Sequence, residues 1–164
     1  MLNPVSDEVV ILLVEDDENY ALILCAALER VPIPNVVRLV RDGAEAVAYL
    51  EGQGHYADRA QHPLPALVVL DLNLPGLDGL EVLRRIRRQS QFKTLRMVML
   101  SSSHNARDSS AAYKLGAHSY LTKPTDFNEA VAMLARLLIP FVPIAPNPEL
   151  PPTPPTSDPD APSA

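Results

Sequence analysis

Polar side chains of chemically useful types stand where apolar runs of this sequence end. They are Glu15, Asp16, Asp71, Ser101 and Lys123. Carboxylates that share one site repel each other unless a positive group lies among them. Lys123 is one such group, and a hard divalent cation is another, because Mg²⁺ binds carboxylate, water and phosphate oxygens. Carboxylates, a hydroxyl, an ammonium and a metal together suit phosphoryl transfer, in which positioning and charge neutralisation supply most of the catalysis.

The apolar runs that precede these residues have the pattern of buried strands. The predicted strands cover residues 9–14, 36–40, 67–70, 96–100 and 118–122. The predicted helices cover residues 18–30, 42–50, 80–89, 106–115 and 128–139. Strands that alternate with helices indicate a parallel sheet covered on both faces, here an α/β fold with a doubly wound (βα)5 sheet. Because parallel strands end at one edge, where the working site of such folds lies, we expect the polar side chains to meet there.

Composition excludes several classes of protein. The net charge of −6 argues against nucleic acid as a partner, and no apolar run approaches the ~20 residues that span a membrane. The single cysteine, Cys25, rules out an internal disulfide framework and suits a reducing cytoplasm. The acidic start does not resemble a signal peptide. We therefore expect a cytoplasmic protein with one domain at 1–139, followed by a Pro-rich and largely disordered tail at 140–164.

Four motifs resemble the receiver domain of two-component response regulators, specifically the stand-alone, chemotaxis-like kind. They are Leu-Val-Glu-Asp at 13–16, Leu-Asp-Leu-Asn-Leu-Pro-Gly-Leu-Asp-Gly at 70–79, Leu-Ser-Ser at 100–102 and Tyr-Leu-Thr-Lys-Pro at 120–124. Each motif alone is weakly specific, but all four in this order and spacing are highly specific. The resemblance covers about residues 9–138 and implies a flavodoxin-like strand order, 2-1-3-4-5.

The resemblance implies a phosphoacceptor and a metal site. Asp71 would receive a phosphoryl group from a histidine kinase or a phosphotransfer protein. Asp16 and the backbone carbonyl of Asn73 would join Asp71 as Mg²⁺ ligands, and Glu15 would reach the metal through water. The protein would then be a signalling switch and not an enzyme, apart from transferring a phosphoryl group to itself and losing it again.

The resemblance also implies a switch. Lys123 would pair with the phosphoryl oxygens, Ser101 would move to bond them, and Tyr120 would turn inward with Ser101. From the residues alone, Tyr120 could equally be a half-buried sheet residue. Ser101 stands where Thr is commoner in the family, so the hydroxyl is kept and a methyl group is lost. The Lys123–Pro124 peptide is expected to be cis, which X–Pro bonds tolerate at small cost.

Other features resemble the single-domain regulators that are paired with bacterial phytochromes. These are the long loop at 52–65, the three serines at 101–103 and the extended C-terminus. A phytochrome kinase would then be the partner, and the last helix with its flanking segments would form a homodimer. We assign Phe127, Val131, Leu134 and Leu138 to the core. A second stripe, formed by Ala130, Met133 and Leu137 with Phe141, Val142 and Ile144 beyond it, is left either for a dimer or for the chain's own tail.

Two other functions compete with the signalling switch. An aspartyl-phosphate phosphatase carries a second Asp two residues after the first, as acid and base, and Asn73 at that position argues against it. A scaffold that ignores phosphate would not need the acidic pair, Asp71, Ser101 and Lys123. The residues do not distinguish a protein that passes a signal on from one that drains phosphate from a kinase.

Overall fold

The computed structural model describes residues 7–142. Within them, five strands form one parallel sheet with the order β2-β1-β3-β4-β5. The strands are β1 (Val9–Val14), β2 (Asn35–Val40), β3 (Leu67–Asp71), β4 (Arg96–Ser101) and β5 (Ser119–Thr122). This is the doubly wound sheet that the alternation predicts, with the strand order that the resemblance implies. The predicted strands agree with the observed ones to within one residue at each end.

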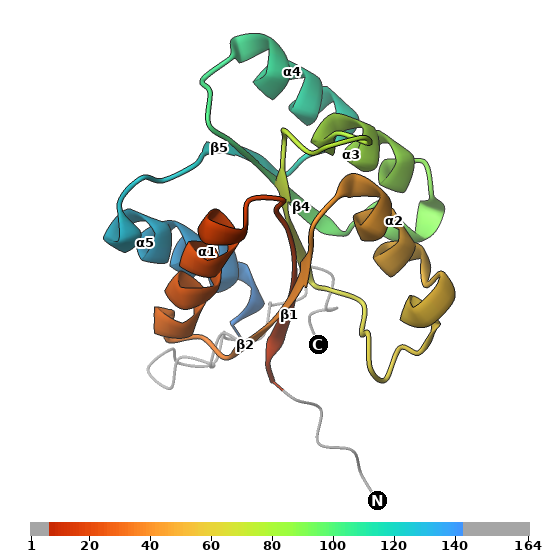
Figure 1. Ribbon diagram of the computed structural model, residues 1–164, viewed down its shortest axis with the longest axis horizontal. Coiled ribbons are helices and arrows are strands. Elements are labelled where there is room, and N and C mark those ends of the chain that lie inside the picture. The colour runs from red at the N-terminus through yellow and green to blue at the C-terminus, as the bar shows by residue number, and fades with distance from the viewer. Residues whose placement is uncertain (1–6, 143–164) are drawn as a thin grey trace, which may run out of the picture.

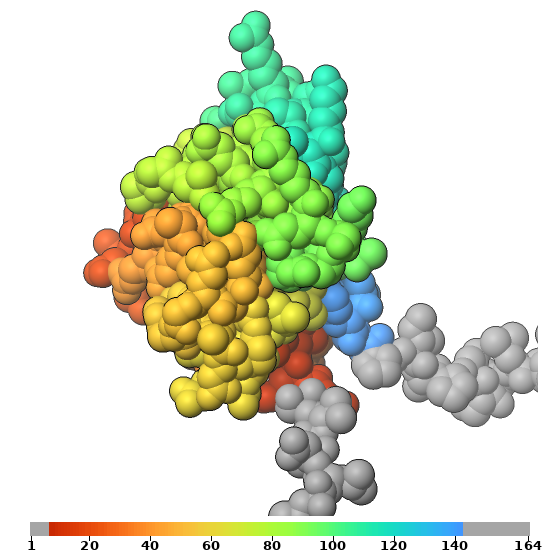
Figure 2. All heavy atoms as spheres, turned by 90° about the vertical axis from the view of Figure 1, so that its right-hand side faces the viewer, coloured from red at the N-terminus to blue at the C-terminus, as the bar shows by residue number. Residues whose placement is uncertain are grey.

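Helices cover both faces of the sheet. The helices are α1 (Glu18–Arg30), α2 (Gly43–Glu51), α3 (Gly79–Arg87), α4 (Ala106–Leu115) and α5 (Phe127–Leu138). Helices α1 and α5 lie side by side on one face, and α2, α3 and α4 cover the other (Figure 1). Figure 2 looks onto the second face, where the yellow segment that follows α2 lies beside the green α3. Short 3-10 turns occur at Gly54–Ala57, Ser90–Phe92 and Ile139–Phe141.

The core is divided by the sheet into two apolar clusters. All five residues of β3 are buried, because this central strand is covered on both faces. Successive side chains of a strand point to opposite faces. Val68 and Leu70 therefore pack with α2 and α3, while Val69 packs with α1 and α5. At about 1.5–3 kcal/mol for each large apolar side chain buried, this double burial fixes the register of β3 and the position of the residue that ends it.

Side chains cap the first turn of all five helices, with Asn105 at α4 and aspartates at the other four. The aspartates are Asp17, Asp42, Asp78 and Asp126, and each accepts backbone N–H bonds from the first turn of its helix. Asp78 also forms a reciprocal capping box with Glu81. Such caps contribute about 1 kcal/mol each and fix where the first turn stands. Asp17 has this structural role directly after the acidic pair, Glu15 and Asp16.

Helix α5 corrects the predicted core stripe. Phe127 was assigned to the core but is 39% exposed, whereas Ala130 and Met133, assigned to a free second stripe, are 1% and 6% exposed. Leu134 and Leu138 are buried as predicted. A helix with two neighbouring apolar stripes can turn either toward the core, and packing against α1 and the sheet selects the one that includes Ala130 and Met133.

The described chain continues for a few residues beyond α5. The turn Ile139–Phe141 continues directly from α5, and the Phe141 side chain packs on the core. The remainder of the predicted tail, including Ile144, lies outside the described residues. No helix among residues 7–142 combines the length and the apolar character needed to cross a membrane.

Candidate functional site

The polar side chains predicted to share one site are gathered at the carboxyl edge of the sheet. Glu15 follows β1, Asp71 ends β3, Ser101 ends β4 and Lys123 follows β5. Glu15 and Asp71 are 2% and 3% exposed, and Ser101 is fully buried. Asp16, in contrast, is exposed to solvent. The site therefore contains two buried acids, Glu15 and Asp71, and one solvent-exposed acid, Asp16.

Lys123 joins the two buried acids. Its Nζ donates to Glu15 Oε2 and to Asp71 Oδ2, both at 2.8 Å. The second oxygens of the two carboxylates are also bonded, because Glu15 Oε1 accepts the backbone N–H of Asp17 at 3.1 Å and Asp71 Oδ1 accepts that of Asn73 at 3.0 Å. Hydrogen bonds to charged groups are stronger and more directional than neutral ones. Both carboxylates are thus held in fixed orientations.

The electrostatics of the site favour adding positive charge. Burial raises the pKa of Glu15 to about 7; hydrogen bonds from Lys123 and from the Asp17 amide oppose this shift, and the nearby charge of Asp71 adds to it. Burial lowers the pKa of Lys123, but its hydrogen bonds and charge interactions with Asp71 and Glu15 outweigh that effect and the pKa is raised. Lys123 is therefore charged at neutral pH, and its single ammonium is bonded to two of the three acidic side chains that lie together here.

The donor set fits a hard divalent cation. Glu15, Asp16 and Asp71 each offer a carboxylate oxygen, and these atoms lie within 4.8 Å of one another. Asp16 and Asn73 line the same hollow at the rim. Oxygen ligands with few protein donors and room for water are typical of Mg²⁺ sites. Asp16, Asp71 and the backbone of Asn73 would hold the ion, with Glu15 behind them.

Neither Ser101 nor Tyr120 forms a hydrogen bond to Asp71 in the described part of the chain. The Ser101 hydroxyl accepts the backbone N–H of Ser103 at 3.1 Å. Tyr120 is half-buried against the core, and its hydroxyl is buried without a hydrogen-bond partner among the described residues. An unpaired buried hydroxyl costs about 1–3 kcal/mol. The packing of the Tyr120 ring against the core must therefore outweigh the cost of burying its hydroxyl.

The structure corrects one prediction at the site and adds two contacts. The Lys123–Pro124 peptide is trans, which is the intrinsically preferred form of an X–Pro bond. Tyr20 of α1 lies with its ring near Lys123 Nζ, and its hydroxyl donates to the Pro124 carbonyl. The imidazole Nδ1 of His104 lies 3.0 Å from Thr122 Oγ1. Neither contact has a local sequence signal, because each joins segments far apart in the chain.

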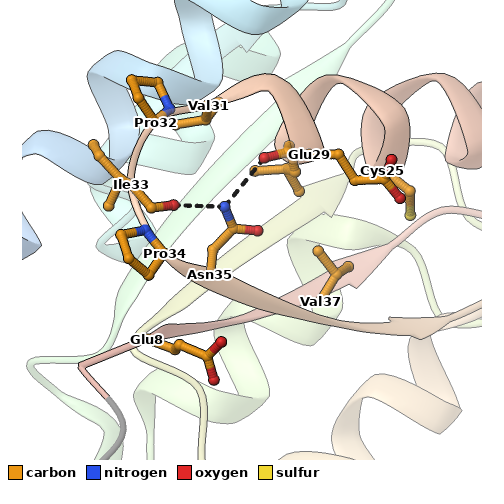
Figure 3. Close-up of a pocket in the computed structure, with 10 residues that line it drawn as sticks. Glu8, Cys25, Glu29, Val31, Pro32, Ile33, Pro34, Asn35 and Val37 are labelled. Atoms are coloured by element: carbon orange, nitrogen blue, oxygen red, sulfur yellow. Dashed lines mark hydrogen bonds between the residues drawn. The ribbon is translucent and has the colours of Figure 1, made fainter.

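A second hollow lies at the opposite edge of the sheet, where α1 meets β2 (Figure 3). Asn35 Nδ2 donates to the carbonyls of Ile33 and Leu28, so its amide closes the turn and does not serve a ligand. Burial, with a smaller effect of the Glu29 charge, raises the pKa of the Cys25 thiol. A thiol whose pKa is raised is a poor nucleophile. Cys25 is thus a packing residue, as its sequence context suggests.

Comparison with known proteins gives a consistent result. A family model for the response regulator receiver domain matches residues 11–135. The response regulator Rcp1 of Synechocystis sp. (strain ATCC 27184 / PCC 6803 / Kazusa) is 38% identical over 125 residues, which cover 76% of this chain and 83% of Rcp1.

Solved structures of related proteins have the same fold. The Mn²⁺-bound form of Rcp1 matches with a TM-score of 0.70 and 37% identity, covering 79% of this chain and 91% of that chain. The phosphorylated cyanobacterial phytochrome response regulator RcpA matches with a TM-score of 0.73 and 36% identity, covering 80% of this chain and 91% of that chain.

Proposed function

The chain belongs to the response regulator receiver family of two-component signalling, and from that membership we propose that Asp71 is its phosphoacceptor. The observation that carries this proposal is the ammonium of Lys123, which lies 2.8 Å from Asp71 Oδ2 and from Glu15 Oε2. It places a fixed positive charge where phosphoryl oxygens would come to lie. Proteins of this family are generally signalling proteins and not enzymes that turn over a substrate.

The proposed reaction needs little beyond positioning. An oxygen of the Asp71 carboxylate attacks the phosphorus of a phosphohistidine; a P–O bond forms, the P–N bond breaks, and the imidazole leaves. The Asn73 amide orients the carboxylate and Lys123 neutralises charge on the transferred oxygens. A bound Mg²⁺, when present, would neutralise further charge on the same oxygens.

The product of this reaction carries new negative charge at the carboxyl edge of the sheet. The Ser101 hydroxyl accepts the backbone N–H of Ser103, two residues further on, and lies 3.4 Å from the Ser103 hydroxyl. A shift of this segment would let Ser101 reach the phosphoryl group. We propose that this shift, with Tyr120 held inward, changes the surface formed by α4, β5 and α5. Loss of the phosphoryl group by hydrolysis would reset the protein.

The partner that we propose is a histidine kinase of the phytochrome type, acting in the cytoplasm. The name of RcpA describes it as a phytochrome response regulator, and that protein is among those similar to this chain.

We also propose a homodimer through α5 and the segment that follows it. After the correction to the α5 stripe, the exposed apolar residues of this region are Phe127, Ile139 and Val142. Sedimentation equilibrium of the full chain measures this directly.

A small phosphodonor tests the central proposal without knowledge of the kinase. The purified chain is incubated with acetyl phosphate and Mg²⁺, and its intact mass is measured with time. We expect wild type to gain one phosphoryl group and Asp71→Asn to gain none. Asp17→Asn is the matched control, since Asn also caps helices and the Asp17 side chain accepts the backbone N–H groups of Asn19 and Tyr20 in the first turn of α1. Uptake by Asp71→Asn at the wild-type rate would overturn the assignment.

A further inference from the structure

Tyr20 of α1 contacts the segment that carries Lys123 at two points. Its hydroxyl donates to the carbonyl oxygen of Pro124 at 3.2 Å, across 104 positions of sequence. Its ring lies under the lysine, with Lys123 Nζ 4.6 Å from the ring centroid. In Figure 1, α1 lies beside α5 on the face where the chain passes from β5 to α5. One side chain from the first turn of α1 thus reaches both the ammonium and the backbone that follows it.

The ring completes the surroundings of the ammonium. A lysine ammonium has three N–H donors. In this structure Glu15 and Asp71 accept from it, and the face of the Tyr20 ring is a third favourable neighbour. Aromatic faces attract cations electrostatically, and more strongly when the pair is shielded from water. The Lys123 side chain is 17% exposed, so the pair is largely shielded.

The backbone around Lys123 is fixed on both sides. Its N–H donates to the Ser101 carbonyl at 2.7 Å, and the next carbonyl, that of Pro124, accepts from Tyr20. Burial raises the pKa of Tyr20 to about 12, while the Lys123 charge lowers it and the Glu15 and Asp71 charges raise it. The phenol therefore remains a donor at neutral pH. The long flexible side chain of Lys123 is in this way fixed at its backbone and at its ammonium group. This lowers the conformational entropy that Lys123 loses when it binds a phosphoryl group.

We propose that Tyr20 is a positioning residue for phosphoryl transfer, which holds the Lys123 ammonium over Asp71 through its ring and, to a smaller extent, through its hydroxyl. The inference rests on the proposed function, since the lysine has this role only if Asp71 accepts a phosphoryl group. It differs from a packing role in a measurable way. A residue that only packs would affect stability, whereas Tyr20 affects the rate of phosphorylation through the ring face that it offers to a charge.

Two substitutions separate the ring from the hydroxyl. Tyr20→Phe keeps the ring and removes the bond to Pro124, and Tyr20→Leu keeps an apolar side chain and removes the ring. With acetyl phosphate and saturating Mg²⁺, we expect Tyr20→Leu to be phosphorylated about fivefold more slowly than wild type, the factor that corresponds to a cation–π contact of this kind. We expect Tyr20→Phe to be slower by only about twofold, the loss of a weak neutral hydrogen bond.

The affinity for Mg²⁺ is the readout that a general distortion of the site would change. We expect Tyr20→Leu to bind Mg²⁺ as wild type does, because the two contacts of the Tyr20 side chain are with Lys123 and Pro124, neither of which is a proposed metal ligand. Leu22→Ala, on the exposed side of the same helix, is the control for substitution in α1 and should retain the wild-type rate. Equal rates for Tyr20→Leu and wild type would overturn the inference. So would a Tyr20→Phe variant as slow as Tyr20→Leu, or a rate that falls in parallel with Mg²⁺ affinity.

A measurement on the unsubstituted protein keeps the inference testable if Tyr20→Leu does not fold. An ammonium over an aromatic face places the ε-methylene protons of Lys123 in the shielding region of the ring. We expect these protons to be shifted upfield in the NMR spectrum of wild type, and values typical of an unfolded chain would overturn the inference. A shifted Lys123 in a protein that takes up no phosphoryl group would instead refute the proposed function and leave the Tyr20 contact standing.

Discussion

Lys123 Nζ donates to Asp71 Oδ2 at 2.8 Å although 52 positions separate the two residues in the sequence. The same nitrogen donates to Glu15 Oε2 at 2.8 Å. One cation is therefore shared by two buried carboxylates before any metal or phosphoryl group arrives. The free protein already holds the negative group that would react and the positive group that would stabilise the product.

Replacing Lys123 by Met should destabilise the protein in the absence of metal. The substitution leaves Glu15 and Asp71 buried without their shared cation, which we expect to cost about 2–4 kcal/mol of unfolding free energy. Because Mg²⁺ can replace the missing charge, adding it should raise the stability of Lys123→Met more than that of wild type. Urea unfolding with and without Mg²⁺ measures both effects.

The control for this prediction is Lys114→Met. Lys114 is an exposed lysine in α4, and its replacement should change stability by no more than about 0.5 kcal/mol. A Lys123→Met protein as stable as Lys114→Met in the absence of metal would show that the buried acids tolerate the loss of their cation, for example by taking up a proton.

Replacing Asp16 by Asn should weaken Mg²⁺ binding while leaving the fold intact. Asp16 is exposed, so its charge stabilises little in the free protein, yet its carboxylate lies within reach of a metal held by Asp71. A tenfold weaker affinity removes about 1.4 kcal/mol of the stabilisation that saturating Mg²⁺ gives. Urea unfolding across a Mg²⁺ titration gives the affinity. Asp17→Asn, one residue further on, should titrate as wild type does; equal affinities for the two variants would remove Asp16 from the metal site.

The sheet and the gathering of the site were predictable from the sequence for one physical reason. In a parallel sheet, each residue that follows a strand lies at the same edge, so Glu15, Asp71, Ser101 and Lys123 had to meet once the strands were recognised. The unbroken apolar run of β3 made that recognition straightforward, because few other elements bury every residue. The family motifs added the strand order and the roles.

The face of α5 and the contact of Tyr20 could not be predicted in the same way. The α5 sequence carries two adjacent apolar stripes, and the choice between Phe127 and Met133 depends on how the helix rotates against α1. The contact of Tyr20 with Lys123 depends on that same packing and on the path of the chain after β5. Both features are set by tertiary contacts between elements distant in sequence, and a local sequence pattern carries no information about such contacts.

Replacing Gly79 by Ala should displace the backbone that carries Asp71. A Cβ at Gly79 would lie 2.4 Å from the Asp71 carbonyl oxygen and 2.9 Å from the Leu72 Cα, both backbone atoms that cannot move aside cheaply. We expect a loss of about 1–3 kcal/mol of stability from overpacking and slower phosphorylation by acetyl phosphate. Gly76→Ala, in the loop that precedes α3, is the control: its φ of 70° makes Ala unfavourable, but a Cβ there meets no atom within 4 Å. Gly76→Ala should lose stability without a slower reaction of Asp71, and a Gly79→Ala protein that reacts at the wild-type rate would contradict the prediction.

Acid should destabilise the protein through His118, at the edge of the sheet opposite the site. His118 Nδ1 accepts the backbone N–H of Met97 at 3.3 Å and lies 3.4 Å from Arg87 Nη2. Burial lowers the pKa of His118, and the charges of Arg87 and Arg96 lower it further. Because the pKa is lower in the folded protein than in the unfolded chain, the unfolded chain binds more protons at mildly acidic pH. The contribution of His118 to stability is therefore fully present above about pH 6.5 and is lost as the pH falls through its lowered pKa.

The variant His118→Asn isolates this contribution, because the Asn side-chain oxygen can accept the Met97 N–H and does not titrate. Urea unfolding at about pH 7.5 and about pH 5.5 spans the ordinary pKa of histidine. We expect wild type to lose more stability than His118→Asn between these two values. His55→Asn, a substitution of an exposed histidine, should behave as wild type does. If wild type and His118→Asn lost the same stability, protonation of His118 would not oppose folding. That result would contradict the prediction.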